Sequence, residues 1–270
     1  MNISPSLISL FTGFGLAGIV SLLAWGAGVL TPSGAGCAFG VGGLIFALGG
    51  WPWATLLLTF FISSSGLSKL FRKRKAMLSE KYAKGSRRDW GQVLANGGLG
   101  AFLVLVQAYH PDQLWPWLAY AGAMATVNGD TWATELGVLS RTPPRLITTG
   151  ELIEHGDSGG VTITGSFATL SGAALLALVM ILFGGPTASP SGAAAVILGG
   201  LAGAFFDSLL GATVQAIYYD PKCAKYTEHR VPDVSPERGW AWMNNDAVNL
   251  ISSMFGALTT VMLWILFVGL

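Results

Sequence analysis

Residues 191–219 read SGAAAVILGGLAGAFFDSLLGATVQAIYY, and this stretch carries a single charged side chain, Asp207. A helix needs about 20 mostly apolar residues to cross the hydrocarbon core of a membrane. Seven further stretches of this kind cover residues 5–30, 33–50, 51–66, 90–109, 113–139, 159–184 and 246–269. The sequence therefore predicts an all-α polytopic membrane protein, with about eight (seven or eight) transmembrane helices in one bundle.

The composition agrees with this prediction and excludes other classes. The 270 residues are 52% hydrophobic and 11% charged, with a mean hydropathy of +0.57, whereas soluble domains carry roughly 25% charged residues. High hydrophobicity at a net charge of +1 excludes a disordered chain. It also leaves no positive excess for nucleic-acid phosphates. Two cysteines exclude a disulfide framework. We expect residues 1–270 to form one integral-membrane domain.

The second and third stretches are the least well separated. Only Gly49-Gly50-Trp51-Pro52 divides them. The sequence allows either two full spans in a tight helical hairpin or a shorter re-entrant pair.

Basic residues predict the orientation. Nine of the fifteen lie between Lys69 and Arg88, and the others are Arg141, Arg145, Lys222, Lys225, Arg230 and Arg238. Eight spans place the three basic loops, at about 67–89, 140–158 and 220–245, on one face, which the positive-inside rule makes cytosolic. Both termini then lie on the non-cytosolic side. No transit peptide or basic signal-peptide start precedes the first span, which predicts a prokaryotic protein, for example in a cyanobacterial inner or thylakoid membrane, or a mature chain.

Four acids fall within or at the edge of predicted spans: Asp130, Glu135, Asp207 and Asp246. An ionised acid at a helix centre costs about 2.5–3.5 kcal/mol on insertion scales, so such residues face a cavity or a partner. The predicted topology places all four at the cytosolic edge, together with Asn96 near the start of the 90–109 span. We therefore expect one polar site at this depth.

Local spacing supports this site. Asp130 and Thr134 share a helix face, as do Asp246 and Asn249. Asp207 also lies in a row of residues four positions apart, which are Gly199, Gly203, Asp207, Gly211 and Gln215. The glycines of this row allow close approach of neighbouring helices.

Carboxylates and amides at one depth fit three interpretations. Mg²⁺ is usually held by one or two carboxylates plus substrate phosphates. A proton or Na⁺ relay of a transporter uses similar residues. Protonated acids can also simply connect helices by hydrogen bonds. The clustering argues against the third but does not separate the first two.

A glycine-rich turn adds a candidate phosphate site. Gly156-Asp157-Ser158-Gly159-Gly160 comes directly before the 159–184 span and follows Arg145 by a short loop. A turn that opens a helix offers free backbone N–H groups to anions. We expect Ser158, Gly159 and Gly160 to cradle phosphate beside Arg145.

Five ordered motifs resemble those of a known membrane family. They are 87–98 (RRDWGQVLANGG), 129–137 (GDTWATELG), 144–148 (PRLIT), 207–215 (DSLLGATVQ) and 244–249 (NNDAVN). The family is that of phytyl-phosphate kinase from tocopherol biosynthesis, which includes animal transmembrane protein 19. The resemblance runs from about Thr31 to the last span. The turn departs from the family pattern Gly-Thr-Asn-Gly-Gly, and the acid at Asp157 leaves room for a metal or base role.

The resemblance implies CTP-dependent phosphorylation of a prenyl (phytyl or geranylgeranyl) monophosphate to the diphosphate, with CTP as co-substrate and Mg²⁺ as cofactor. Our hypothesis combines this with the depth-matched acids. The catalytic and metal-holding residues are Asp130, Asp207 and Asp246, with Glu135 as a weaker fourth. The substrate- and nucleotide-binding residues are Lys69, Arg87, Arg88, Asn96, Asn128, Thr134, Arg145, Ser158, Gly159, Gly160, Gln215, Lys225 and Asn249.

Two alternatives remain open at this stage. One is an ion-coupled transporter or flippase of an anionic or prenyl substrate, which would use the same acids for coupling. The other is a CDP-lipid cytidylyltransferase, which would share CTP, Mg²⁺ and the membrane site. No nucleic-acid partner is expected in any of these cases.

Overall fold

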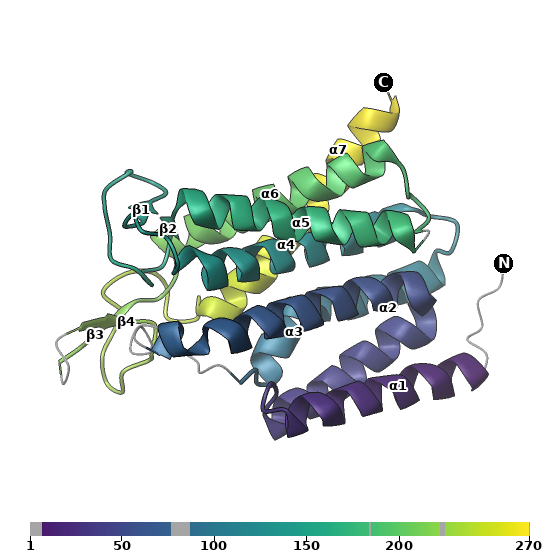
Figure 1. Cartoon of the computed structure of the whole chain (residues 1–270), viewed down its shortest axis with the longest axis horizontal. Coiled ribbons are helices and arrows are strands. Elements are labelled where there is room, and N and C mark those ends of the chain that lie inside the picture. The colour runs from purple at the N-terminus through teal and green to yellow at the C-terminus, as the bar shows by residue number, and fades with distance from the viewer. Residues whose placement is uncertain (1–6, 77–86, 184, 222–224, 270) are drawn as a thin grey trace.

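The computed structural model describes residues 7–76, 87–183, 185–221 and 225–269. Over these ranges the chain forms α1 (Leu7–Gly26), α2 (Pro32–Ala76), α3 (Trp90–Tyr109), α4 (Trp115–Gly137), α5 (Ile163–Leu182), α6 (Pro190–Thr213) and α7 (Asn245–Gly269) (Figure 1). All of them except α4 are long and apolar enough to cross a membrane. The predicted all-α membrane bundle is confirmed.

Helix α2 is two helices joined by a sharp kink. Gly50 has φ 69° and ψ −160°, a conformation essentially reserved for glycine. Pro52 follows in the first turn of the second half, where its missing N–H costs no helical hydrogen bond. The Leu57 side chain reaches Gly42 across the kink, so the halves, 32–49 and 51–76, fold back as a hairpin. The described ranges thus contain the expected eight helical segments. The second half runs ten residues beyond the predicted end at 66, so Lys69 lies on a helix rather than in a loop.

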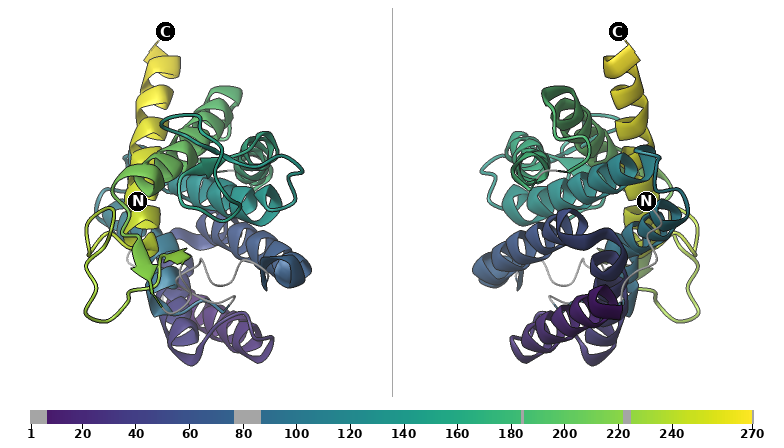
Figure 2. Two further views of the ribbon diagram at one scale, coloured as in Figure 1. Left: turned by 90° about the vertical axis from the view of Figure 1, so that its left-hand side faces the viewer. Right: turned by 90° about the vertical axis from the view of Figure 1, so that its right-hand side faces the viewer.

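Helix α4 forms the centre of the bundle. Its residues are buried without a break from Pro116 to Gly129, and it packs against α2, α3, α5, α6 and α7. The end-on views place it between the α1–α2 side and the α5–α7 side (Figure 2). Trp53, Trp117 and Tyr120 fill the core beside it, and the Tyr120 hydroxyl donates to the Trp53 carbonyl at 2.8 Å. Such complete burial explains why α4 tolerates polar residues that a lipid-facing helix would not.

The glycine stripe of α6 packs as predicted. A Cβ on Gly203 would overlap the Thr126 side chain of α4 and lie 3.0 Å from the Gly256 Cα of α7. A Cβ on Gly199 would overlap Thr260 of α7. These glycines therefore let three helices approach closely, which fixes the lateral position of Asp207 one turn further along α6.

Two small hairpins depart from the all-α expectation. Strand β1 (Arg145–Leu146) pairs with β2 (Gly160–Val161), and β3 (Tyr218–Asp220) pairs with β4 (Lys225–Thr227), both antiparallel. The predicted 159–184 and 191–219 spans are correspondingly shorter. Helix α5 begins only at Ile163, after β2, and α6 ends at Thr213, before β3.

The ends of the bundle differ in character. Both hairpins, the end of α2 and the start of α3 lie at one end, on the left of Figure 1. The first residue of α1 and the last of α7 lie at the opposite end. The described residues of the basic segments 140–158 and 220–245 therefore share one face, as eight spans require; residues 222–224 lie outside them. Residues 77–86 of the first basic segment lie outside the described residues.

Candidate functional site

A cavity of about 690 Å³ lies at the hairpin end of the bundle. Every helix except α1 contributes to its wall, together with the 155–162 loop and residues 228–230. Ligand-binding pockets are typically about 300–1,000 Å³. The cavity is therefore large enough for a nucleotide or a comparable polar ligand.

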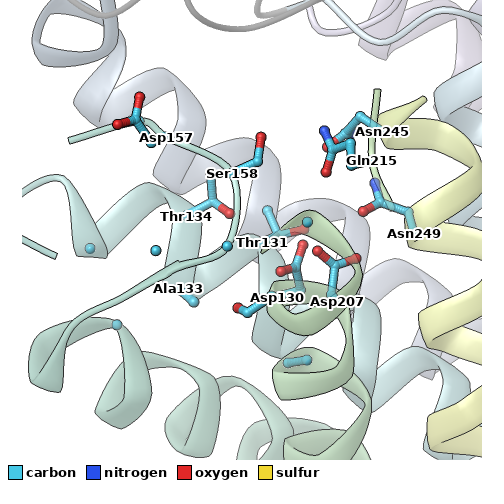
Figure 3. A pocket seen from close by; sticks show the side chains of 18 of the residues that line it. Asp130, Thr131, Ala133, Thr134, Asp157, Ser158, Asp207, Gln215, Asn245 and Asn249 are labelled. Atoms are coloured by element: carbon cyan, nitrogen blue, oxygen red, sulfur yellow. The ribbon is translucent and has the colours of Figure 1, made fainter. Parts of the chain in front are cut away.

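Two aspartates face one another in this cavity. Asp130 comes from the last third of α4 and Asp207 from the last third of α6. Their carboxylates point toward each other (Figure 3), and they are near enough to repel electrostatically. Ser252 of α7 donates to the Asp207 Oδ2 at 2.9 Å. Two facing carboxylates are destabilised by mutual repulsion unless a cation or a proton lies between them.

The predicted set of three aspartates is not assembled as one cluster. Asp246 lines the cavity from the first turn of α7, where the helix dipole stabilises an acid. Within the described ranges, no group of three or more His, Cys, Asp or Glu side chains is placed to hold a metal ion. The pair Asp130–Asp207 still suits Mg²⁺, which commonly takes one or two carboxylates and completes its shell with phosphate oxygens and water.

Glu135 is a buried residue of the cavity wall and interacts with groups at the cavity edge. It is 3% exposed and accepts a hydrogen bond from the Ser68 Oγ at 2.6 Å. Its negative charge also acts on Arg88. This arrangement makes Glu135 a partner of the α2 and α3 ends rather than a member of the aspartate pair.

Arg88 is a half-buried cation that lines the cavity. Its Nη2 donates to the Ser64 Oγ at 2.8 Å, and its guanidinium lies over Phe60, 5.2 Å from the ring centre. Its Nη1 is buried without a hydrogen-bond partner in the described part of the chain. Burial lowers the pKa of Arg88 to about 10, and the charge of Glu135 opposes this change. Arg88 therefore remains positively charged at neutral pH, with donor capacity left for an anion.

The glycine-rich turn forms one wall, although it does not open the helix as predicted. Helix α5 is instead capped by Thr162, whose Oγ1 accepts from the Gly165 N–H at 2.9 Å. Ser158, Gly159 and Gly160 all line the cavity. Gly159 has φ 85°, and a Cβ there would lie 2.6 Å from backbone atoms of Ala212. The turn thus packs directly on the end of α6, which only glycine permits.

Glu228 connects three walls of the cavity, and the sequence analysis missed it. It accepts hydrogen bonds from the Ser158 Oγ at 2.6 Å and from the Gln215 Nε2 at 2.8 Å. It thereby joins the glycine-rich turn, the end of α6 and the segment after β4. An acid in a polar loop carries no hydropathy signal, and only the adjacent His229 and Arg230, which also line the cavity, could have hinted at it.

Most of the predicted site residues meet in this cavity. They are Arg88, Asn96, Asp130, Thr134, Glu135, Ser158, Gly159, Gly160, Asp207, Gln215, Asp246 and Asn249. Besides Glu228, the polar residues that the sequence analysis did not select include Gln92, Thr131, His229 and Arg230. Gln92 lies within the 87–98 motif and forms a capping box with Asp89 at the start of α3, so the motif itself was its only signal.

Asn128 lies outside the cavity, in contrast to the prediction. It is fully buried, its amide nitrogen donates to the Gly172 carbonyl at 2.8 Å, and its Oδ1 accepts from the Ser63 Oγ at 2.9 Å. Both hydrogen-bonding groups of the side chain connect helices. Asn128 therefore stabilises the packing of α2, α4 and α5 rather than binding a ligand.

Four predicted basic residues also fall outside the lining. Lys69, Arg87, Arg145 and Lys225 are all exposed. The Arg145 guanidinium donates to the Gly150 carbonyl at 2.7 Å and so closes its own loop. The backbone of Arg145 does lie beside the end of the glycine-rich turn, because β1 pairs with β2, but its side chain does not line the cavity.

Comparison with known proteins places the sequence among integral membrane proteins. The family described as "Integral membrane protein DUF92" matches residues 15–257. "Protein PGR" of Arabidopsis thaliana is 33% identical over 233 residues, which cover 78% of this chain and 81% of the relative. An "Uncharacterized membrane protein" of Synechocystis is 29% identical, covering 85% and 80%. "Protein VTE6, chloroplastic" of Arabidopsis thaliana is 23% identical, covering 87% and 65%. No solved structure matches. These matches confirm the family that the motifs indicated.

Proposed function

Because the chain belongs to the DUF92 family of integral membrane proteins, we propose that it is a membrane-embedded kinase that transfers a phosphoryl group from CTP to a prenyl monophosphate. The observation that carries this proposal is the Asp130–Asp207 pair in a polar cavity at the end of the bundle. The motif resemblance to the phytyl-phosphate kinase family supplies the substrate class. The proposed orientation places this end of the bundle at the cytosolic face.

The proposed reaction breaks one P–O bond and forms another. The bond between the terminal phosphorus of CTP and its bridging oxygen breaks, and CDP leaves with the bonding electrons. A phosphate oxygen of the prenyl monophosphate forms a new bond to that phosphorus, which gives the prenyl diphosphate. The attacking oxygen is already anionic, so no strong general base is needed. Catalysis then depends on positioning and charge neutralisation.

The residues of the cavity fit a Mg²⁺–nucleotide complex. Asp130 and Asp207 would hold Mg²⁺, and the hydrogen bond from Ser252 orients Asp207. When bound, the ion would neutralise charge on the phosphates. Arg88 contributes a positive charge and an N–H donor, Nη1, that has no hydrogen-bond partner among the described residues. Polar groups on the opposite walls, including Asn249 and Ser158 (Figure 3), can bind phosphate or ribose oxygens.

The test is a product assay on the purified full-length chain. It is incubated with CTP, Mg²⁺ and geranylgeranyl monophosphate, and nucleotide products are separated by chromatography. Release of CDP with equal amounts of prenyl diphosphate supports the kinase. Release of pyrophosphate would instead identify a cytidylyltransferase. Absence of both, in protein that binds the lipid and exchanges it between membrane leaflets, would identify a transporter.

Variants connect the activity to the aspartate pair. Asp130→Asn and Asp207→Asn keep side-chain size but remove one charge each, and each should lower kcat by about 10²- to 10³-fold, as removal of a key electrostatic group does. Asp112→Asn, at an exposed position near the start of α4, is the matched control and should leave kcat unchanged. Full activity of either cavity variant would refute the assignment of the pair.

A further inference from the structure

A second, apolar cavity of about 230 Å³ adjoins the polar one. It lies among α1, both halves of α2 and the first turns of α3. Its wall is made almost wholly of aliphatic and aromatic side chains, among them Leu16, Val20, Phe46, Leu57 and Phe61. We call it the apolar groove. None of the acids of the polar cavity lines it.

The two cavities share three polar side chains. Arg88, Gln92 and Asn96 line both the polar cavity and the apolar groove. They follow at intervals of four residues, so Gln92 and Asn96 lie on one face of α3, with Arg88 just ahead of its cap. A ligand that occupies both spaces must pass these three side chains.

Arg88 makes this junction suitable for an anion. Its guanidinium lies over the Phe60 and Phe61 rings at 5.2 and 5.8 Å, and its Nη1 is buried without a partner in the part of the chain described here. A buried donor without a partner is costly. A phosphate group at the junction would supply its acceptor, while the neighbouring rings continue into the groove.

The length of the groove matches one half of a membrane. Its wall on α2 runs from Trp51 to Phe61, and the ten helical steps between them span about 15 Å at 1.5 Å each. The hydrocarbon core of a bilayer is about 30 Å thick. A hydrocarbon tail held in the groove would therefore extend through one leaflet while its phosphate stays at the polar edge.

From these observations we propose that the apolar groove binds the hydrocarbon tail of the phosphorylated lipid substrate, with Arg88, Gln92 and Asn96 holding its phosphate at the mouth of the polar cavity. This inference rests on the proposed kinase function for the identity of the ligand. It also assigns the lipid and the nucleotide to different sides of the site. The lipid enters from the α1–α3 side, and the nucleotide occupies the side formed by the glycine-rich turn and residues 228–230.

Photo-crosslinking tests the location of the tail without requiring catalysis. The full chain in nanodiscs is irradiated, without nucleotide, in the presence of geranylgeranyl monophosphate that carries a diazirine on its last isoprene unit. Mass spectrometry should find the label on residues 16–21 of α1 and 38–61 of α2. Unlabelled geranylgeranyl monophosphate should compete, and phosphatidylglycerol should not. Labels confined to α5, α6 or α7, or competition by phosphatidylglycerol, would overturn the proposal.

A matched pair of variants tests the groove in turnover. Val20→Trp fills the groove, whereas Ile19→Trp changes the neighbouring side chain, which lies outside it and is 56% exposed. Val20→Trp should lower kcat/KM for geranylgeranyl monophosphate at least tenfold and leave that for five-carbon dimethylallyl monophosphate within twofold. Ile19→Trp should change neither. Equal effects of the two variants would refute the groove.

The two proposals fail in different ways. If the label falls in the groove but no phosphoryl transfer is found, the tail site stands and the kinase proposal is wrong. If CDP is released but the label falls elsewhere, the kinase proposal stands and the tail site is wrong.

Because α1 is peripheral, thermal unfolding of both tryptophan variants, compared with the wild type, shows whether they remain folded.

Discussion

Glu228 connects the glycine-rich turn, the end of α6 and the segment after β4. Replacement of Glu228 by alanine tests whether this arrangement is needed for activity. The interactions of the Glu228 carboxylate include hydrogen bonds from Ser158 at 2.6 Å and from Gln215 at 2.8 Å. Gln215 also lines the cavity but is only 3% exposed, so its amide has little access to water as a substitute acceptor. Ser158 lines the cavity and can rehydrate.

The expected loss follows from these contacts. A buried donor left without an acceptor costs about 1–3 kcal/mol, and loss of an ordinary hydrogen bond costs about 1 kcal/mol. Glu228→Ala should therefore destabilise the closed arrangement by about 2–4 kcal/mol. With about 1.4 kcal/mol per factor of ten, kcat/KM for CTP should fall by about 30- to 700-fold. Glu228→Gln keeps an acceptor oxygen and should lose clearly less.

Two measurements check this expectation. Steady-state kinetics give kcat/KM, and hydrogen–deuterium exchange reports order in peptides 154–160 and 225–230. Both peptides should exchange faster in Glu228→Ala. Glu237→Ala, an exposed acid in the same loop, is the control and should match the wild type. Kinetics within twofold of the wild type, with unchanged exchange, would show that Glu228 does not organise the site.

Three further predictions concern single positions. Arg88→Lys should make the activity depend on pH. Burial lowers the pKa of Arg88 to about 10. The same burial would let a lysine lose its charge at a lower pH than arginine does, because the ordinary pKa of lysine, about 10.4, is lower than that of arginine. A basic side chain keeps its positive charge only below its pKa, so the activity of the variant should fall about tenfold between pH 7 and 9. The activity of the wild type should stay constant over this range. Parallel pH profiles of the two proteins would contradict this prediction. Gly159→Ala places a non-glycine residue in a left-handed conformation, which costs about 1–3 kcal/mol, and pushes its Cβ against the backbone of Ala212. KM for CTP should therefore rise, and the melting temperature in detergent should fall. An unchanged KM would argue against the turn as a wall of the ligand site. Gly199→Ala should lower the melting temperature, because its Cβ would overlap α7. The control Gly15→Ala should not lower it, because a Cβ there meets no atom within 4 Å and alanine is favoured over glycine in helices by about 1 kcal/mol. Equal shifts of the melting temperature in the two variants would refute the close packing of α6 and α7.

The sequence was sufficient to predict the secondary structure of the spans. Hydropathy runs require helices because lipid offers no partner for backbone groups, and α3 has the predicted bounds of 90–109. It also predicted that the acids lie at one depth. Asp130, Asp207 and Asp246 all line one cavity, since a charge within a span can be tolerated only where it faces an interior.

Tertiary structure decided which polar groups actually meet. Asn128 and Asp130 are two residues apart, yet the first connects helices and the second enters the cavity, because a helix turns about 200° over two residues. Arg145 is near the glycine-rich turn in sequence but bonds to Gly150. Glu228 meets Ser158 from 70 residues away. Hydropathy reports depth in the membrane, but lateral position depends on how the helices and loops pack around α4, and no pattern along a single sequence records it.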